Sequence, residues 1–342
     1  MRIDDPDFDS AAPGTRDAFL VTVLRRQIAF MRSNIPFWNE RLSAAGVHED
    51  QIETLADLGR IPIFSKEDLR ALRPADLLPK QSLLDLKICR WTSGTTGRPT
   101  VTFWTETDWA ALVGSTARML SRQAPFTGVS AFNGYSQAHL TGPLYSAALR
   151  TIGAVVFDRS HHTEDQFPTP AQMDLFDFNT VVLPGRTTRG KGLGIAELLA
   201  EDAHGFARRA VRWWIGSSET FNNTCRALAQ EQGVTTVTNL YGSSEFGLFA
   251  ISCKSQPSDF HVAQGYVLVE VVDPTGTPVA DGQAGRIVVT HLSGMDEHGD
   301  AQLHTGTQIL RLAGGDSATL LTGPCSCGLN AARLRNIGRI NR

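Results

Sequence analysis

The sequence predicts an α/β protein in which a mostly parallel sheet with helices is followed by a β-rich lobe. Three observations support this prediction. The 342 residues are enough for about two domains, strand-like and helix-like segments alternate up to about residue 255, and the segments beyond it are β-like and separated by turns. Hydrophobic residues make up 42% and charged residues 20% of the chain, a composition that excludes a disordered, collagen-like or coiled-coil protein.

The elements of the α/β body follow one another along the chain. Apolar residues at helical spacing predict a helix over 15–45 that ends at Gly46, and Ser65 followed by acidic residues predicts the N-cap of another helix. The predicted strands are 84–91, 129–133, 154–158, 180–183, 211–215 and 234–240. The predicted helices between them are 107–122, 195–203 and 220–232. This alternation is typical of crossover units on a parallel sheet.

The β-rich lobe follows the body. Its predicted strands are 266–272, 285–291, 308–312 and 318–321, with turns at 273–276 and 281–282. The predicted organisation is therefore an acidic flexible tail over 1–14, an α/β body over 15–254 and the lobe over 255–342. The acidic residues of the tail are expected to be solvated; they are Asp4, Asp5, Asp7 and Asp9.

Charge, cysteine usage and hydropathy restrict the partners and the compartment. The chain has 32 Lys+Arg and 35 Asp+Glu, a net charge of −3, which argues against nucleic acid or an anionic membrane as partner and favours a small neutral or anionic ligand. No run of roughly 18 apolar residues and no basic, apolar leader is present in the sequence. Five cysteines are an odd and sparse set, so we expect a reducing, cytoplasmic environment and no membrane association.

A first candidate binding loop follows the predicted strand 84–91. Within 92–97 the sequence Thr-Ser-Gly-Thr-Thr-Gly places four hydroxyls and two glycines together, which lets the backbone approach an anion closely. The pattern lacks the spacing and the lysine of a Walker loop. It favours a phosphate-binding loop, and an ordinary Gly/Thr-rich turn is the alternative.

A second candidate segment closes the predicted strand 234–240. It contains Tyr241, Gly242, Ser243, Ser244 and Glu245, at the carboxyl end of a parallel strand, where small-molecule sites form in open sheets. The Glu245 carboxylate could hold Mg²⁺ against a polyphosphate, the Ser244 hydroxyl could bond a phosphate oxygen, and the Tyr241 ring could cover a base. A capping serine beside a solvated glutamate is the alternative.

Together the two segments resemble the adenylate-forming superfamily of acyl-CoA synthetases, adenylation domains and luciferases, and most closely its phenylacetate-CoA ligase branch. Further stretches at 34–42 and 58–69 are similar to that branch, and the resemblance extends from about residue 20 to the end. It implies the large N-terminal domain of the acyl-CoA synthetase-like fold, with ATP or AMP and Mg²⁺ as ligands.

The resemblance also assigns site residues. It makes Glu245, Ser244 and His139 catalytic candidates, although a lone histidine can equally be structural. The nucleotide-binding candidates are Thr92, Ser93, Gly94, Thr95, Thr96, Gly97, Ser217, Ser218, Glu219, Tyr241, Gly242, Ser243, Gln308 and Arg311. The substrate-binding candidates are Tyr135, His139, Thr141 and Gly142.

Four residues of the lobe and its entry form a candidate metal site. Cys253, His261, Cys325 and Cys327 offer three thiolates and one imidazole, a set that suits tetrahedral Zn²⁺ in a closed structural site. Members of the branch carry a similar set, as the resemblance implies. Buried reduced cysteines beside a surface histidine are the alternative.

Two departures from the family affect the expected activity. The sequence ends at a stretch similar to the family's hinge, with Asn341 in place of an aspartate, and the small C-terminal domain with its lysine is not present in it. Gln308 stands where the family has an aspartate that accepts both ribose hydroxyls. An amide lacks the charge and the second equivalent oxygen, so nucleotide affinity should fall.

Three functional hypotheses follow. The first is ATP-dependent activation of a small, aromatic carboxylic acid as an acyl-adenylate for transfer to an amine or a thiol such as CoA or a carrier protein. The second is a diverged enzyme that condenses or transfers an acyl group without adenylation. The third is a non-catalytic partner of a complete ligase, and either a homodimer or a partner chain would fit it.

Overall fold

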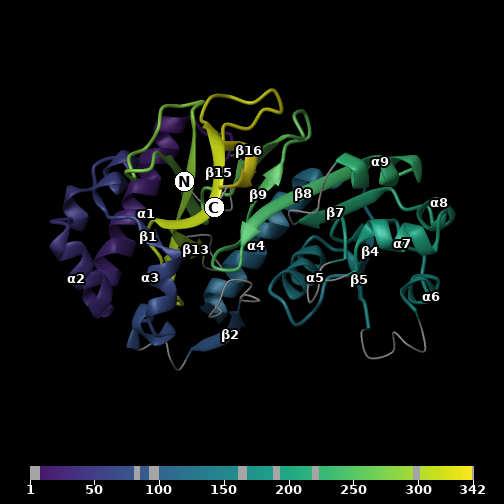
Figure 1. The fold of residues 1–342 in the computed structure, drawn as a ribbon, viewed down its shortest axis with the longest axis horizontal. Helices are drawn as coiled ribbons and strands as arrows, with labels where there is room; N and C mark the ends of the chain where they lie inside the picture. Colours follow the sequence, from purple (N-terminus) through teal and green to yellow (C-terminus); the bar gives the residue numbers. More distant parts are fainter. Residues whose placement is uncertain are drawn as a thin grey trace. The chain divides into compact units, whose positions relative to one another are not determined.

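The computed structural model describes residues 8–80, 85–91, 100–160, 168–187, 193–217, 223–295 and 301–340. The chain divides into two compact units: unit 1 consists of 1–115 and 243–342, and unit 2 of 116–242. Figure 1 marks both ends of the chain in unit 1. The predicted boundary near residue 254 is defined by a change of secondary structure and stays a prediction.

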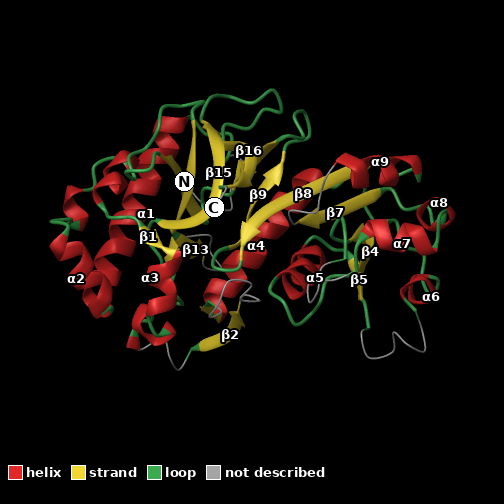
Figure 2. Cartoon of the chain, in the orientation of Figure 1, coloured by secondary structure: helices red, strands yellow, loops and turns green. Residues whose placement is uncertain are grey.

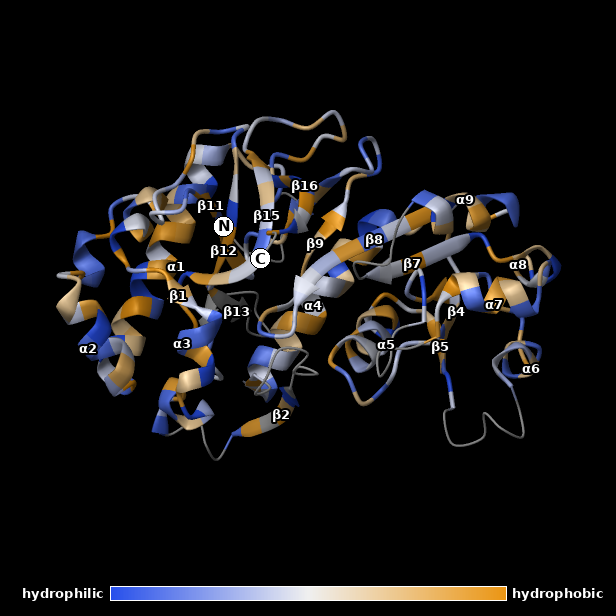
Figure 3. Cartoon of the chain, in the orientation of Figure 1, coloured by the Kyte–Doolittle hydropathy of each residue, from blue (hydrophilic) through white to orange (hydrophobic). Residues whose placement is uncertain are grey.

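Helices form the first part of unit 1. They are α1 (Pro13–Asn34), α2 (Pro36–Ala44), η1 (Glu49–Gln51), η2 (Leu55–Arg60), α3 (Lys66–Ala71) and η3 (Pro74–Leu77), with the short strand β1 (Phe64–Ser65) before α3. The single helix predicted over 15–45 is divided at Ile35, whose extended backbone is what Pro36 requires of the residue before it. The Ser65 hydroxyl accepts from the Asp68 amide and caps α3, as predicted. Figure 3 shows both hydrophilic and hydrophobic faces on α2 and α3.

The sheet of unit 1 contains the β-like segments of the predicted lobe. Its strands are β9 (Gly247–Ser252), β10 (Asp259–Val262), β11 (Val267–Val272), β12 (Ala284–His291), β15 (Leu312–Leu321) and β16 (Arg333–Arg339). They are antiparallel in the order β11-β12-β15-β16-β10-β9, and β1 pairs with β15 in parallel. The predicted strand 308–312 is wrong for 308–311, because Arg311 has a left-handed backbone (φ 47°) and β15 begins only after it.

Two antiparallel ribbons complete unit 1. The first pairs β2 (Leu86–Trp91) with β3 (Val101–Thr105), and the second pairs β13 (Ser293–Met295) with β14 (Ala301–Leu303). Strand 84–91 was expected among the parallel strands, and this expectation is wrong. It forms a ribbon because its partner is the next strand in the chain, and only the candidate phosphate loop lies between them.

Unit 2 contains the predicted crossover units. Its strands are β4 (Ser130–Asn133), β5 (Val155–Asp158), β6 (Thr180–Val182), β7 (Trp213–Ser217) and β8 (Thr236–Ser243). They are parallel in the order β8-β7-β6-β4-β5. The helices are α4 (Glu106–Gln123), which begins in unit 1, and α5 (Thr141–Thr151), α6 (Thr169–Met173), α7 (Ile195–Glu201), α8 (Gly205–Arg208) and α9 (Asn223–Glu231), drawn in red in Figure 2.

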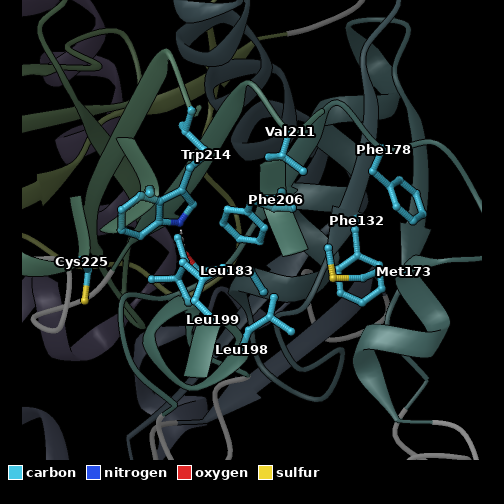
Figure 4. Packing of buried hydrophobic residues seen from close by; sticks show 14 residues of the cluster. Phe132, Met173, Phe178, Leu183, Leu198, Leu199, Phe206, Val211, Trp214 and Cys225 are labelled. Atoms are coloured by element: carbon cyan, nitrogen blue, oxygen red, sulfur yellow. Dashed lines mark hydrogen bonds between the residues drawn. The ribbon is translucent and has the colours of Figure 1, made fainter. Parts of the chain in front are cut away.

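The core of unit 2 packs helix side chains against the parallel strands. Phe132, Phe178, Phe206 and Trp214 are fully buried in one cluster, and the Trp214 indole N–H donates to the Leu183 carbonyl at 2.9 Å (Figure 4). Burial of each such side chain contributes about 1.5–3 kcal/mol. The carboxyl ends of the strands, where the candidate residues of unit 2 lie, are thus held on a rigid base.

The beginning of the described chain differs from the expected solvated tail. Phe8 and Asp9 are buried, with 1% and 3% exposure, so the expectation for Asp9 is wrong. The Phe8 ring packs against Phe19 of α1. This contact anchors the segment in the core of unit 1. Asp4, Asp5 and Asp7 lie outside the described residues. None of the helices in the described ranges is long and apolar enough to cross a membrane.

Candidate functional site

Part of the candidate nucleotide site lies outside the described residues. These residues are Thr92, Ser93, Gly94, Thr95, Thr96 and Gly97 of the loop, and Ser218 and Glu219. Asn341 of the predicted hinge also lies outside the described residues. The structure describes the segments on either side of the loop. The strand that follows the loop, β3, is tied to two other parts of the candidate site in unit 1.

The first tie joins β3 to the turn that carries Glu245. The Thr102 hydroxyl donates to the main-chain oxygen of Ser244 at 3.2 Å. Ser243, Ser244 and Glu245 belong to unit 1, and Ser244 is half-buried. The sequence-predicted carboxylate and the strand after the predicted phosphate loop are therefore neighbours in this unit.

Glu245 is a buried carboxylate that lies beside a lysine. Its side chain is 1% exposed, and Nζ of Lys66 lies 3.2 Å from Oε1. Within the described part of the chain neither carboxylate oxygen has a hydrogen-bond partner, so among these residues the ion pair is what compensates for burying this charge. The sequence analysis did not identify Lys66 as a site residue. The one available signal was its position directly after the predicted cap Ser65, at the start of a helix.

The second tie joins β3 and the start of α4 to the loop 304–308. Asp108, fully buried, accepts from the amides of Thr105 at 3.0 Å, Thr305 at 3.0 Å and Gly306 at 2.6 Å. The Phe103 N–H of β3 donates to the Thr307 hydroxyl at 2.8 Å, and the Thr307 N–H donates to the Phe103 carbonyl at 2.9 Å. A Cβ on Gly306 would lie 2.3 Å from the Phe103 oxygen, so only glycine allows this close approach.

Gln308 faces the protein interior at the end of that loop. Its amide nitrogen donates to the carbonyls of His304 at 2.7 Å and Gly306 at 2.9 Å, and its amide oxygen accepts from Gln27 of α1. The side chain is fully buried. Every polar group of this amide is bonded within unit 1, and its predicted contact with ribose stays a prediction.

Arg311 is also held by the protein. Its guanidinium donates to the Glu270 carboxylate through two nitrogens and to the carbonyls of Gly59, Ile61 and Gly276. Burial raises the pKa of Glu270, and the Arg311 charge opposes this shift. All five N–H groups of Arg311 are used in these bonds. Its predicted contact with nucleotide stays a prediction that this arrangement does not favour.

Two buried histidines, His291 and His304, lie close to Phe246, the residue after Glu245. The His291 ring stacks on His304 with centroids 4.2 Å apart and lies 4.5 Å from the Phe246 ring, while Nδ1 of His304 is 3.3 Å from Asp108. Burial and the neighbouring His304 lower the pKa of His291 well below its usual value, so the ring is neutral. The sequence reasoning missed this pair, because nothing in the local pattern brings residues 291 and 304 together.

In unit 2, Tyr135 follows β4 and supports the end of β7. Its hydroxyl donates to the Ser217 carbonyl at 2.5 Å and accepts from the Ser217 amide at 2.8 Å. Burial raises the pKa of Tyr135 to about 12. The ring lies 5.2 Å from the Tyr145 ring. The hydroxyl of this predicted substrate residue therefore positions Ser217, and its ring is buried, so its contact with a substrate stays a prediction.

The segment 139–142 leads from β4 into α5. The Asn133 amide donates to the Gly142 carbonyl at 2.9 Å and to Asp158 at 3.1 Å, which fixes the start of α5 against two strands. A Cβ on Gly142 would lie 2.3 Å from the Ser136 oxygen. His139 and Thr141 are half-buried beside it, and Tyr241 and Gly242 are half-buried at the end of β8.

The four predicted metal ligands lie together in unit 1. One ligand atom each of Cys253, His261, Cys325 and Cys327 falls within 4.8 Å of all the others. The Cys253 and Cys325 sulfurs are 3.6 Å apart, and Nε2 of His261 is 3.2 Å from the Cys327 sulfur. Nδ1 of His261 faces the Ala331 carbonyl at 3.3 Å, the arrangement that orients a metal-binding imidazole. The residues therefore fit a tetrahedral zinc site.

Curated relatives are similar to this chain in sequence, and a solved structure is similar to it in fold. The phenylacetate-coenzyme A ligase of Thermus thermophilus is 29% identical over 325 residues, covering 91% of this chain and 67% of the relative. The phenylacetate-coenzyme A ligase of Escherichia coli is 30% identical over 274 residues, covering 76% and 59%. A 2-hydroxyisobutyryl-CoA ligase, solved in an open conformation with 2-HIB-AMP and CoA, has a TM-score of 0.82 at 20% identity, covering 98% of this chain and 77% of that chain.

These relatives agree with the resemblance seen in the motifs. The structural likeness shows the acyl-CoA synthetase-like fold, and no protein-family model matches the chain. The chain spans between 59% and 67% of the length of the two curated relatives. The chain is therefore similar in sequence to phenylacetate-CoA ligases and has the acyl-CoA synthetase-like fold.

Proposed function

We propose that this chain carries out ATP-dependent activation of a small, aromatic carboxylic acid as an acyl-adenylate, with the thiol of CoA as the acceptor. The relatives are named as CoA ligases, which supports this class of reaction. The observation that carries the proposal is the buried Glu245 carboxylate, 3.2 Å from the Lys66 ammonium, beside the strand that follows the candidate phosphate loop.

The geometry suits the handling of a triphosphate. The Glu245 carboxylate would hold Mg²⁺, which supplies charge neutralisation at the phosphates when bound. Lys66 places a cation beside the buried carboxylate, where it adds positive charge at the same site. The bonds of Asp108 and Thr307 fix β3, the strand that follows the candidate loop in sequence, within unit 1.

The acid would bind in unit 2. The segment 139–142 at the carboxyl end of β4 offers half-buried polar groups, and the buried rings of Tyr135 and Tyr145 pack together beside it. The relatives named phenylacetate-coenzyme A ligase support an aromatic acid as the substrate. His139 is the candidate to contact its carboxylate.

The zinc site would have a structural role. Cys253, His261, Cys325 and Cys327 would use all four tetrahedral positions and leave none open for chemistry. The metal would cross-link the β9–β10 hairpin to the segment before β16. Reduced thiols of this kind also support the proposal of a cytoplasmic protein. A homodimer or a partner chain stays a proposal.

Isotope exchange between pyrophosphate and ATP tests the activity directly. The protein is incubated with Mg²⁺, ATP and single acids from a panel that includes phenylacetate, benzoate and 2-hydroxyisobutyrate. We expect exchange that depends on an aromatic acid and is lost in Glu245→Gln. Exchange with aliphatic acids alone would overturn the aromatic preference and leave the reaction class intact.

Calorimetry with ATP and AMP separates the alternatives. Micromolar binding together with acid-dependent exchange would support adenylation. Silence towards both nucleotides, with no exchange for any acid, would overturn the proposal and favour acyl transfer without nucleotide. The buried, fully bonded Gln308 amide is the observation that keeps that alternative in view.

A further inference from the structure

We propose that the N-terminal segment 8–12 and Asn330 are part of the framework of the metal site, so that metal binding and docking of this segment are a single coupled equilibrium. The inference rests on the zinc site proposed above. Everything in it lies within unit 1.

Asn330 is the residue through which the two parts are joined. It lies three residues after Cys327 and one residue before Ala331, whose carbonyl faces His261. The Asn330 amide N–H donates to the Asp9 carbonyl at 2.7 Å, and its side-chain amide donates to the Ser10 carbonyl at 2.7 Å. The Asn330 carbonyl accepts from the Arg16 guanidinium at 2.9 Å.

The N-terminal segment is itself anchored in the core. Phe8 is 1% exposed and its ring packs on Phe19 of α1, while Arg16 is 3% exposed. Segment 8–12 can therefore hold Asn330 in place rather than simply follow it. The loop 325–331 also contains a tight turn. In this turn the Cys325 N–H donates to the Leu329 carbonyl, and the Gly328 N–H donates to the Cys325 carbonyl.

The loop 325–331 is thus fixed from two sides. A metal ion bound by Cys325 and Cys327 would fix it against Cys253 and His261, and the N-terminal segment fixes it through Asn330. Since each event orders the same loop, each lowers the entropic cost of the other. Linkage then requires that docking raises metal affinity by the same factor by which the metal strengthens docking.

Zinc affinity, measured by competition with a chromophoric chelator, tests this coupling. We expect Asn330→Ala to lower zinc affinity about 2–10-fold, because it removes the side-chain bond to the Ser10 carbonyl and keeps the main-chain bonds. Phe8→Ala, which loosens the same segment from its other end, should act in the same direction. Asn39→Ala is the matched control, because Asn39 is an exposed residue of α2, and its zinc affinity should equal that of the unchanged protein.

Hydrogen exchange on the unchanged protein provides a readout that needs no variant. Removal of zinc with a chelator should accelerate amide exchange in 8–16 as well as in 253–262 and 325–331. Acceleration limited to the two ligand segments, or an Asn330→Ala affinity equal to that of Asn39→Ala, would overturn the coupling. If the chain takes up no zinc at all, the metal site itself is refuted, and the exchange assay for adenylation reports separately on the proposed function.

Discussion

Nζ of Lys66 lies 3.2 Å from Oε1 of Glu245, and this ion pair joins the first residue of α3 to the turn before β9. The lysine is 25% exposed and the glutamate 1%, so the cation can reach solvent while the carboxylate cannot. A divalent cation at Glu245 would have to share the carboxylate with Lys66. The pair is therefore a place where ligand binding should rearrange charges.

Glu245→Gln should abolish most of the activity with little effect on folding. The amide keeps the shape of the side chain but cannot hold a divalent cation, so we expect acid-dependent pyrophosphate exchange to fall by about 10²–10³-fold. The matched control is Glu53→Gln, at an exposed position of the same unit. A variant that retains full exchange would remove Glu245 from the mechanism.

Lys66→Met should destabilise the protein, because it leaves a buried carboxylate without its cation. We expect a loss of about 1–3 kcal/mol in the free energy of unfolding at neutral pH, measured by urea denaturation. The loss should be smaller in the double variant with Glu245→Gln, since the uncompensated charge is then absent. Equal losses in both backgrounds would show that the two side chains do not interact energetically.

Gln308→Glu tests whether this position serves the fold. A carboxylate of the same shape would face the carbonyl oxygens of His304 and Gly306 where the amide nitrogen now donates. We expect a loss of about 1–3 kcal/mol in the free energy of unfolding, with no gain in ATP affinity by calorimetry. A tighter ATP complex and unchanged stability would instead make residue 308 a nucleotide contact.

Gly306→Ala should separate the loop 304–308 from β3. The added Cβ would lie 2.3 Å from the Phe103 oxygen and 2.7 Å from Asp108, and such overpacking costs about 1–3 kcal/mol. Thermal denaturation measures the effect. Gly314→Ala is the control, because nothing lies within 4 Å of a Cβ at that position. Similar melting temperatures for both variants would contradict the close approach.

Tyr135→Phe should reveal the ionisation of a buried phenol. Because burial raises the pKa from 10 to about 12, Tyr135 favours folding below pH 10, and this contribution, about 2–3 kcal/mol, is lost as the pH rises towards 12. The variant lacks this alkaline loss but leaves the Ser217 main chain without its partner, so it should be less stable at neutral pH. Denaturation across this range, with absorbance titration of tyrosinate, checks both signs.

Sequence patterns predicted the strands of unit 2 and the helices α4, α7 and α9, because strands and amphipathic helices alternate there, but not the helices α5, α6 and α8. The Ser65 cap and the four metal ligands could also be predicted, since each depends on residue types with a specific chemistry. The exceptions have physical causes. Pro36 divides the first helix, and the left-handed backbone of Arg311 delays β15.

Contacts between distant parts of the chain could not be predicted. Lys66 and Glu245 are far apart in sequence, as are Gln27 and Gln308, and no local pattern identifies such pairs. The same holds for Asp9, whose acidic surroundings in sequence indicated a solvated tail. Its burial accompanies the packing of Phe8 on Phe19 and the bond from the Asn330 N–H to the Asp9 carbonyl, and residues 9 and 330 meet only in the tertiary structure.

The division of unit 1 between the two ends of the chain has a consequence for synthesis on the ribosome. Unit 2 is complete once residue 242 has been made, whereas α1 and α2 must wait for partners from residues 243–342. Until then the buried Trp38 and Gln27 lack Gln308, to which both are bonded. The nascent chain therefore exposes an apolar helical surface until these residues have been made, and protection of that surface by a chaperone would favour its yield.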